Sequence, residues 1–257
     1  MSTFVYASDL HGNHEAYDRL FAMEAAAVVL GGDLLPYPLK VGGDLVGIQK
    51  KFVSDFLAKK LESRRSFWLL GNDDWEAVLP MLEGKGTLLH DRSAPFLDGF
   101  EIAGYSCVPV TPFGMKDFDR YDSASWTPDQ MPTRCLLSSP DGLRTVPLSE
   151  VRARGTIAED LERLEARTKA AKTIYVTHSP PWRTKLDRLV DGTPIGSRAI
   201  REFIERAQPP LTLHGHVHES PGVDKLGRTV MVNPGDSVRR LQAVRVDLGD
   251  FSVTPVR

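Results

Sequence analysis

The stretch LTLHGHVHES, from Leu211 to Ser220, contains three of the seven histidines of the chain, directly after a short apolar run. Side chains of a β-strand alternate between its two faces, so His214, His216 and His218 would share one face only on a backbone that stayed extended. The glycine among them more often ends a strand, and we predict a turn that brings His216 and His218 together while His214 stays on the strand. Two imidazoles in one space indicate a metal site. A His-rich surface loop is the alternative, because such a cluster alone is only a compositional indication.

The first apolar run of the chain also precedes two candidate ligands. Thr3–Ala7 is rich in β-branched and aromatic residues and predicts a buried strand, after which come Asp9 and His11. Side chains two residues apart on a backbone that is still extended point the same way, so this carboxylate and imidazole could hold one ion. For Asp9 the alternative is a polar loop that caps the next helix, which we expect at residues 13–23.

Three more apolar runs end in oxygen or imidazole ligands. They are Ala25–Leu30 before Asp33, Ser66–Leu70 before Asn72, Asp73 and Asp74, and Lys172–Val176 before His178. Strands that alternate with helices predict parallel pairing, and sites in such sheets form beyond the carboxyl ends of the strands. Turn and cap chemistry explains each residue alone. Five strand ends that all supply ligand atoms favour a metal site instead.

The remaining pattern predicts a single domain over residues 1–257. Further helices are expected at residues 44–61, 75–82, 156–171 and 197–207, and short strands at 87–89, 94–97, 100–105, 229–232 and 243–246. The loop 34–43 is expected to lie beside Asp33. Segment 109–154 lacks periodicity, is rich in Pro, Ser, Asp and aromatic residues, and is too long for an ordinary connection. It predicts a partly ordered cap, with a floppy insertion as the alternative.

Composition narrows the function classes. The chain of 257 residues has 41% hydrophobic and 26% charged residues and a net charge of -2, which indicates neither a disordered chain nor an electrostatic nucleic-acid binder. It starts without the pattern of a secretory signal, and no apolar run approaches the ~20 residues that span a bilayer, so we expect a cytoplasmic protein without a membrane partner. Cys107 and Cys135 are expected to be reduced. Composition does not indicate an oligomeric state.

Five motifs, in the order DLH, GGD, GND, THSPP and GHVH, resemble those of the calcineurin-like metallophosphoesterases. The resemblance covers most of the chain except the loop before Lys50 and segment 109–154. The tail from Val232 to Ser237 is similar to small prokaryotic members of uncharacterised substrate. The resemblance implies an α/β fold, a two-sheet sandwich with βα units and a metal site at the carboxyl ends of the strands.

The resemblance also implies two divalent metal ions. It places Asp9, His11 and His218 on one ion, Asn72, His178 and His216 on the second, and Asp33 between both. Imidazole, carboxylate and amide ligands without thiolate suit Mn, Fe, Zn or Co. Two such ions about 3.5 to 4 Å apart hold a bridging hydroxide and polarise phosphoryl oxygens, so no protein nucleophile is needed. The chain contains neither a G-x-S-x-G nor a P-loop pattern.

We therefore expect hydrolysis of a small-molecule phosphate ester, with phosphodiesters preferred. A phosphomonoesterase or nucleotide phosphohydrolase is the alternative within the enzymes. A non-catalytic binding or scaffold protein of the same fold is a further alternative, but such proteins lose metal ligands, and here every inherited ligand residue is present.

The chain departs from the fullest family pattern after Asn72. Many members carry a histidine there, thought to protonate the leaving group or stabilise the transition state, whereas this chain has Asp73. Asn72, Asp73 and His178 are the candidate catalytic residues that the resemblance implies. Beside two cations the pKa of Asp73 is expected to be lowered, which would make it a poor general acid.

Three other residues lie near the motifs. The resemblance implies that Asp74 orients a ligand histidine. His14 could replace the missing proton donor or lie on the helix surface. His214 could support the site or simply end its strand.

Overall fold

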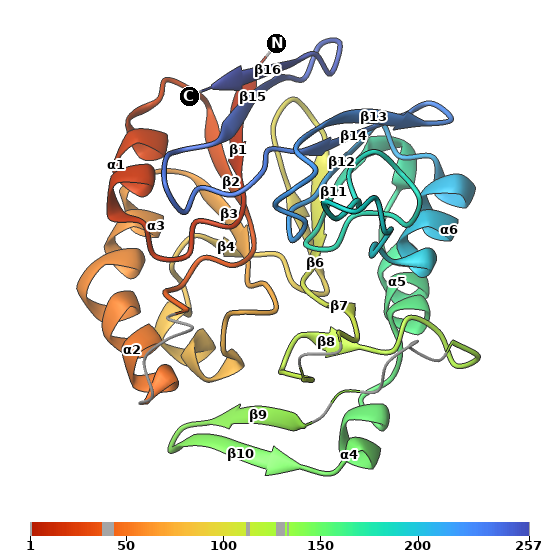
Figure 1. The fold of residues 1–257 in the computed structure, drawn as a ribbon. Coiled ribbons are helices and arrows are strands. Elements are labelled where there is room, and N and C mark those ends of the chain that lie inside the picture. Colours follow the sequence, from red (N-terminus) through yellow and green to blue (C-terminus); the bar gives the residue numbers. More distant parts are fainter. Residues whose placement is uncertain (1, 38–43, 112–113, 127–131, 133, 257) are drawn as a thin grey trace.

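The computed structural model describes residues 2–37, 44–111, 114–126, 132 and 134–256 (Figure 1). Its first sheet contains β1 (Thr3–Ala7), β2 (Ala27–Gly31), β3 (Ser66–Leu69), β4 (Thr87–Leu88), β15 (Ala243–Asp247) and β16 (Val253–Val256). The strands lie in the order β16-β15-β1-β2-β3-β4. β1 to β4 pair in parallel, whereas β15 pairs antiparallel with both β1 and β16.

The second sheet has the same number of strands and a similar parallel centre. Its strands are β5 (Arg92–Pro95), β6 (Glu101–Tyr105), β11 (Thr173–Thr177), β12 (Leu211–Leu213), β13 (Gly222–Leu226) and β14 (Thr229–Asn233), in the order β13-β14-β12-β11-β6-β5. β6, β11, β12 and β14 are parallel, and an antiparallel strand closes each edge. The chain crosses from the first sheet to the second between β4 and β5.

Helices cover the outer face of each sheet. They are α1 (His14–Ala22), α2 (Leu45–Phe52), α3 (Ala58–Ser63), α5 (Ile157–Glu165) and α6 (Arg198–Ala207). Figure 1 shows α1, α2 and α3 outside the first sheet and α5 and α6 outside the second. The two-sheet α/β sandwich predicted from the sequence is therefore confirmed. No helix among the described residues is long and apolar enough to cross a membrane.

Both faces of the central strands are buried, which explains their continuous apolar sequences. In β1, Phe4 and Tyr6 pack into the cluster between the sheets, whereas Val5 and Ala7 pack on the helical side. The register pairs Ala7 with Leu30 of β2. The carboxyl ends of β1 and β2 therefore lie side by side, and the loops that follow them begin at the same end of the sandwich.

Three predicted helices differ from those observed. The helix expected at 44–61 is interrupted by a π-helical turn, Val53–Leu57. The one expected at 75–82 is a 3₁₀ helix, Glu76–Leu82, and contains Pro80, which cannot supply a backbone donor. The helix expected to reach residue 171 ends at Glu165, and the Thr168 hydroxyl donates to carbonyls of its last turn.

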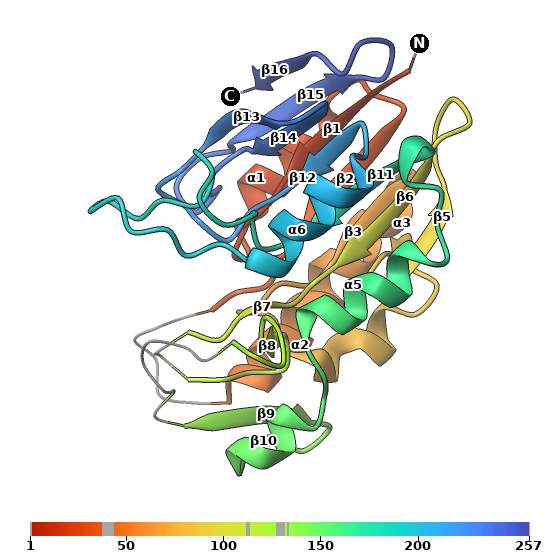
Figure 2. The same ribbon diagram turned by 90° about the vertical axis from the view of Figure 1, so that its right-hand side faces the viewer.

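The described part of segment 109–154 is folded. β7 (Val108–Pro109) pairs with β8 (Asp119–Arg120), and β9 (Cys135–Ser139) forms a hairpin with β10 (Gly142–Val146) before α4 (Leu148–Arg152). The segment has its own hydrophobic cluster, made of Val110, Met115, Tyr121, Cys135, Leu137, Val146 and Val151. Figures 1 and 2 show the hairpin and α4 beneath the end of the sandwich toward which β1 runs. Residues 112–113, 127–131 and 133 of this segment, and 38–43 of the predicted loop 34–43, lie outside the described residues.

Partly buried hydrogen bonds join this segment to the 3₁₀ helix. The Asp117 carboxylate accepts the backbone N–H of Glu76 at 2.9 Å and that of Ser138 at 3.0 Å. The Ser138 hydroxyl in turn accepts the N–H of Ala77 at 2.9 Å. The segment is therefore held against the element that follows the GND motif.

Candidate metal centre

The candidate ligands converge at the carboxyl ends of β1, β2 and β3 in one sheet and β11 and β12 in the other. The residues gathered there are Asp9, His11, Asp33, Asn72, His178, His216 and His218. Pairing of Val176 with Leu213 aligns the ends of β11 and β12. Two sheets that end at the same side bring residues 209 positions apart, such as Asp9 and His218, into contact.

The backbone turns sharply at these residues. Asp9, His11, Asp33 and His216 have φ angles of 54°, 43°, 50° and 66°. The extended backbone predicted between Asp9 and His11 is therefore wrong. Left-handed conformations are uncommon for residues other than glycine, although Asp and His adopt them more readily than most. Hydrogen bonds hold the loop: Asp9 N–H donates to the carbonyl of Gly32 at 2.9 Å and His11 N–H to that of Asp33 at 2.9 Å.

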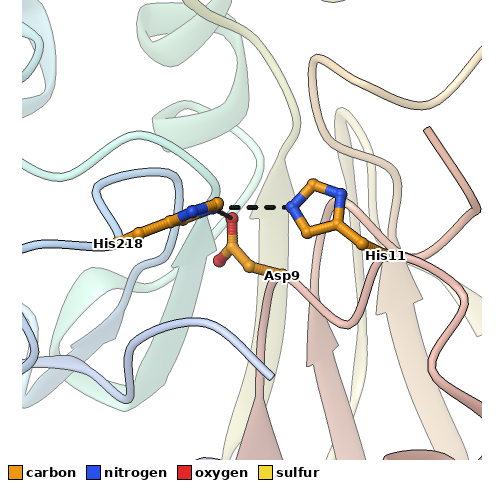
Figure 3. A group of neighbouring side chains, drawn as sticks. All are labelled: Asp9, His11 and His218. Atoms are coloured by element: carbon orange, nitrogen blue, oxygen red, sulfur yellow. Dashed lines mark hydrogen bonds and ion pairs between the residues drawn. The ribbon is translucent and has the colours of Figure 1, made fainter. Parts of the chain in front are cut away.

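The first ligand group consists of Asp9, His11 and His218 (Figure 3). His218 Nε2 lies 3.1 Å from Asp9 Oδ1 and 3.5 Å from His11 Nε2. The buried Asp9 carboxylate also accepts the backbone N–H of His216 at 3.1 Å. Two ring nitrogens that face each other beside a carboxylate form a suitable cage for a cation.

The second group consists of Asp33, His178 and His216, with Asn72 beside them. His178 Nε2 lies 3.3 Å from Asp33 Oδ2 and 3.2 Å from the Asn72 carbonyl oxygen. Asp33 Oδ2 is also 4.0 Å from His11 Nε2, so this carboxylate lies between the two groups. In each group the ligand atoms are within 4.8 Å of one another, and their nitrogen and oxygen chemistry fits a divalent transition metal.

Comparison with known proteins identifies the family. The model of the calcineurin-like phosphoesterases matches residues 2–220. The chain belongs to this family. Calcineurin-like phosphoesterases usually bind divalent metals, which agrees with the two ligand groups.

Solved structures share the fold at low sequence identity. TT1561 of Thermus thermophilus is 16% identical, with a TM-score of 0.63 over 100% of this chain and 98% of that one. A 5'-nucleotidase from Candida albicans is 13% identical, with a TM-score of 0.51 over 96% of this chain and 47% of that one. GAP50, the anchor in the inner membrane complex of Plasmodium, is 12% identical, with a TM-score of 0.51 over 100% of this chain and 85% of that one.

A curated relative matches part of the chain more closely. The uncharacterized protein MJ1162 of Methanocaldococcus jannaschii is 40% identical over 72 residues, which cover 26% of this chain. The match spans about a third of the relative's own length, 33%.

The ionisable side chains of the centre shift one another's pKa values. Burial disfavours the ionised form of Asp33, but the charge and hydrogen bond of His178, the charge of His11 and the Asp73 N–H together outweigh burial and lower the pKa of Asp33 well below its usual range. Burial would likewise lower the pKa of His178, but Asp33 raises it to about 10, and Asp9 raises that of His218 to about 9. Burial dominates at His216 and lowers its pKa to about 3. The two buried carboxylates thus attract positive charge to this phosphoesterase centre.

Fixed hydrogen bonds orient His178 and exclude His214 from the centre. His178 Nδ1 donates to the carbonyl of Gly31 at 2.8 Å, so Nε2 faces the site. His214 is buried, with Nδ1 2.9 Å from the Thr177 hydroxyl and Nε2 2.8 Å from that of Thr212. Both ring nitrogens of His214 are therefore used between β11 and β12, and its role is structural.

Asp74 and His14 have structural positions as well. The buried Asp74 carboxylate accepts the N–H groups of Gly71, Leu34 and Leu35 at 2.9, 3.0 and 2.8 Å. The expectation that it orients a ligand histidine is wrong: it fixes the GGD loop against the GND turn. His14 is exposed, and its ring packs 4.2 Å from that of Phe56 on the helix surface.

The glycine of the GND motif is required for close approach. A Cβ on Gly71 would collide with Asp33 and lie 2.6 Å from His178 Nε2. We expect Gly71→Ala to lower the affinity for Mn²⁺ at least about tenfold, because both side chains must shift. Titration calorimetry tests this, with Gly222→Ala as the control, since its nearest contact would be 3.8 Å from Leu186. Unchanged Mn²⁺ affinity in a folded Gly71→Ala protein would contradict the prediction.

Sequence reasoning missed Lys116. Its ammonium pairs with Asp73 Oδ1, although the two residues are 43 positions apart. Burial raises the pKa of Asp73, the charge of Asp33 raises it further, and Lys116 opposes both. This increase applies to the centre without bound cations, so the lowering of the Asp73 pKa beside two cations stays a prediction. Nothing in segment 109–154 distinguishes Lys116 from other basic residues before the fold is known.

Proposed function

We propose that this phosphoesterase hydrolyses phosphodiesters with two divalent metal ions. In this proposal Asp9, His11 and His218 bind one ion, Asn72, His178 and His216 the other, and Asp33 both. The observation that carries it is the pair of ligand groups, each with ligand atoms within 4.8 Å, on the two sides of Asp33. Manganese, iron, zinc and cobalt are the candidate ions.

The residues of the centre prepare it for this chemistry. Bound divalent ions would supply the activated water and the charge that polarises phosphoryl oxygens. Asn72 is neutral, so it adds a ligand oxygen without reducing the positive charge of the centre. The carbonyl of Gly31 fixes the tautomer of His178, and the N–H of His216 fixes Asp9.

The negative charge of Asp73, beside the ligand groups, supports a preference for diesters. Asp73 Oδ1 lies 3.4 Å from Asn72 Nδ2, and its carboxylate forms a third group with His11 and Asp33. A phosphodiester carries one negative charge, whereas a phosphomonoester carries between one and two at pH 7. The monoester therefore meets more repulsion from Asp73 than the diester does, although the ion pair with Lys116 reduces this difference.

Metal analysis and a substrate panel test the proposal. We expect the purified protein to contain about two equivalents of transition metal by mass spectrometry. Assays with each of Mn²⁺, Fe²⁺, Zn²⁺ and Co²⁺ should show faster hydrolysis of bis(p-nitrophenyl) phosphate than of p-nitrophenyl phosphate or AMP. The reverse order would favour a phosphomonoesterase or nucleotide phosphohydrolase. Full metal occupancy without turnover of any phosphate ester would favour a scaffold protein.

A further inference from the structure

Lys116 brings a positive charge from segment 109–154 to the metal centre. Its side chain is 15% exposed, and its ammonium lies 4.8 Å from the centroid of the Tyr37 ring. The backbone N–H of Lys116 donates to the buried Asp119 carboxylate at 2.7 Å, which fixes the turn before β8. Lys116 is therefore fixed by Asp119 within its own segment, and its ammonium reaches Tyr37 and Asp73 outside the segment.

Asp73 connects this ammonium to the ligand groups. The Asp73 N–H donates to Asp33 Oδ1 at 2.8 Å, and the Asp73 carboxylate lies within 4.8 Å of ligand atoms of His11 and Asp33. Lys116 Nζ pairs with that same carboxylate. The Asp73 carboxylate therefore lies between the Lys116 ammonium and the ligand atoms of His11 and Asp33.

The ammonium has donors left for a ligand. In the described part of the chain, Asp73 Oδ1 is the one hydrogen-bond acceptor of Lys116 Nζ. An ammonium has three N–H donors, so Asp73 leaves two of them unused. Without Lys116, a phosphate at the centre would face the negative charge of Asp73 alone.

We propose that Lys116 donates to a phosphoryl oxygen of the bound substrate, with Asp73 as the group that positions its ammonium. This inference rests on the proposed function and adds a substrate-binding residue from outside the family motifs. It also assigns a role to segment 109–154, which supplies a cation that recognises the phosphate group. The competing explanation is that the ion pair is purely structural and only holds segment 109–154 against the core, a role that we call a strut.

Orthophosphate binding to the metal-loaded protein tests the proposal. By titration calorimetry, Lys116→Met should weaken orthophosphate binding about ten- to hundredfold, the contribution of one charge-assisted hydrogen bond. Lys116→Arg should recover most of the affinity. Arg144→Gln is the matched control, because it breaks an exposed ion pair with Glu150 in the same segment and should leave binding unchanged.

Asp73→Asn separates substrate binding from a strut. A strut predicts that Asp73→Asn and Lys116→Met both lower the melting temperature and leave phosphate affinity alone. Our proposal predicts opposite effects on orthophosphate. Lys116→Met weakens binding, whereas Asp73→Asn strengthens it by up to about fivefold, because the asparagine oxygen can still accept from the Lys116 ammonium while the negative charge that faces the phosphate is removed. If Lys116→Met does not fold, the phosphate affinity of Asp73→Asn still tests the strut, because a strut predicts no change in that affinity.

Kinetics distinguish a failure of this inference from a failure of the proposed function. Lys116→Met should lower kcat/KM for aryl and alkyl diesters by the same factor, mainly through KM, because the phosphoryl oxygens are common to both. A loss confined to alkyl diesters would place the ammonium at the leaving oxygen and overturn the proposal, as would unchanged orthophosphate affinity. A wild-type protein that binds orthophosphate through Lys116 but hydrolyses no ester would refute only the function.

Discussion

Asp33→Asn is expected to yield a folded protein with an incomplete metal centre and a kcat/KM for bis(p-nitrophenyl) phosphate lowered by about 10³-fold or more. Asp33 Oδ2 lies 3.3 Å from His178 Nε2 and 4.0 Å from His11 Nε2, so one oxygen serves both ligand groups. An asparagine retains a carbonyl oxygen that can accept the Asp73 N–H, which keeps the GND turn in place. The second oxygen and the negative charge are lost, and with them the bridge.

Metal content and turnover of Asp33→Asn should fall together. Mass spectrometry of the purified variant should find less than half of the wild-type metal, and calorimetric titration with Mn²⁺ should show weakened binding. Asp187→Asn is a suitable control, because Asp187 is a buried carboxylate that accepts N–H groups of Arg183 and Thr184 in another loop. Full occupancy of two ions in Asp33→Asn would contradict the assignment of Asp33 as the bridge.

The convergence of the motifs at strand ends could be predicted from strand direction, whereas the two-sheet sandwich was predicted from the resemblance to the family. Parallel strands end at the same side of a sheet, so residues that follow β1, β2 and β3 meet, and so do those that follow β11 and β12. The two sets come together because the two sheets also end at the same side of the sandwich. Asp9 and His218 illustrate this: their side chains touch at 3.1 Å although they come from opposite ends of the family match.

Features that depend on local backbone geometry were not predictable in the same way. Asp9 and His11 converge through left-handed residues rather than an extended strand, because hydrogen bonds to the GGD loop override the local preference. Asp74 binds three backbone N–H groups instead of a histidine, since the two loops that it joins leave these donors without another partner in the described chain. Lys116 needed the tertiary structure to be found at all.

The leaving group is expected to control the rates of this enzyme. The ion pair with Lys116 keeps Asp73 a hydrogen-bond acceptor, so Asp73 has no proton to give to a departing oxygen. General-acid help contributes about 10² to 10⁴ in rate and matters most for basic leaving groups. Bis(p-nitrophenyl) phosphate, whose leaving group is a stable phenolate, should therefore be hydrolysed well and dialkyl phosphates poorly.

Asp73→His should change the ratio between these two substrates. An imidazolium beside the departing oxygen can donate a proton, so kcat for an alkyl diester such as dimethyl phosphate should rise by about 10² relative to bis(p-nitrophenyl) phosphate. Steady-state rates of both substrates, with metal content measured in parallel, test this. Lys116→Met is the contrast, since it should leave the ratio unchanged. If Asp73→Ala instead lowers the rates of all diesters equally at full metal occupancy, and by orders of magnitude more than Lys116→Met does, Asp73 acts on the phosphoryl group directly. A role confined to the leaving oxygen, or to positioning Lys116, cannot produce such a loss.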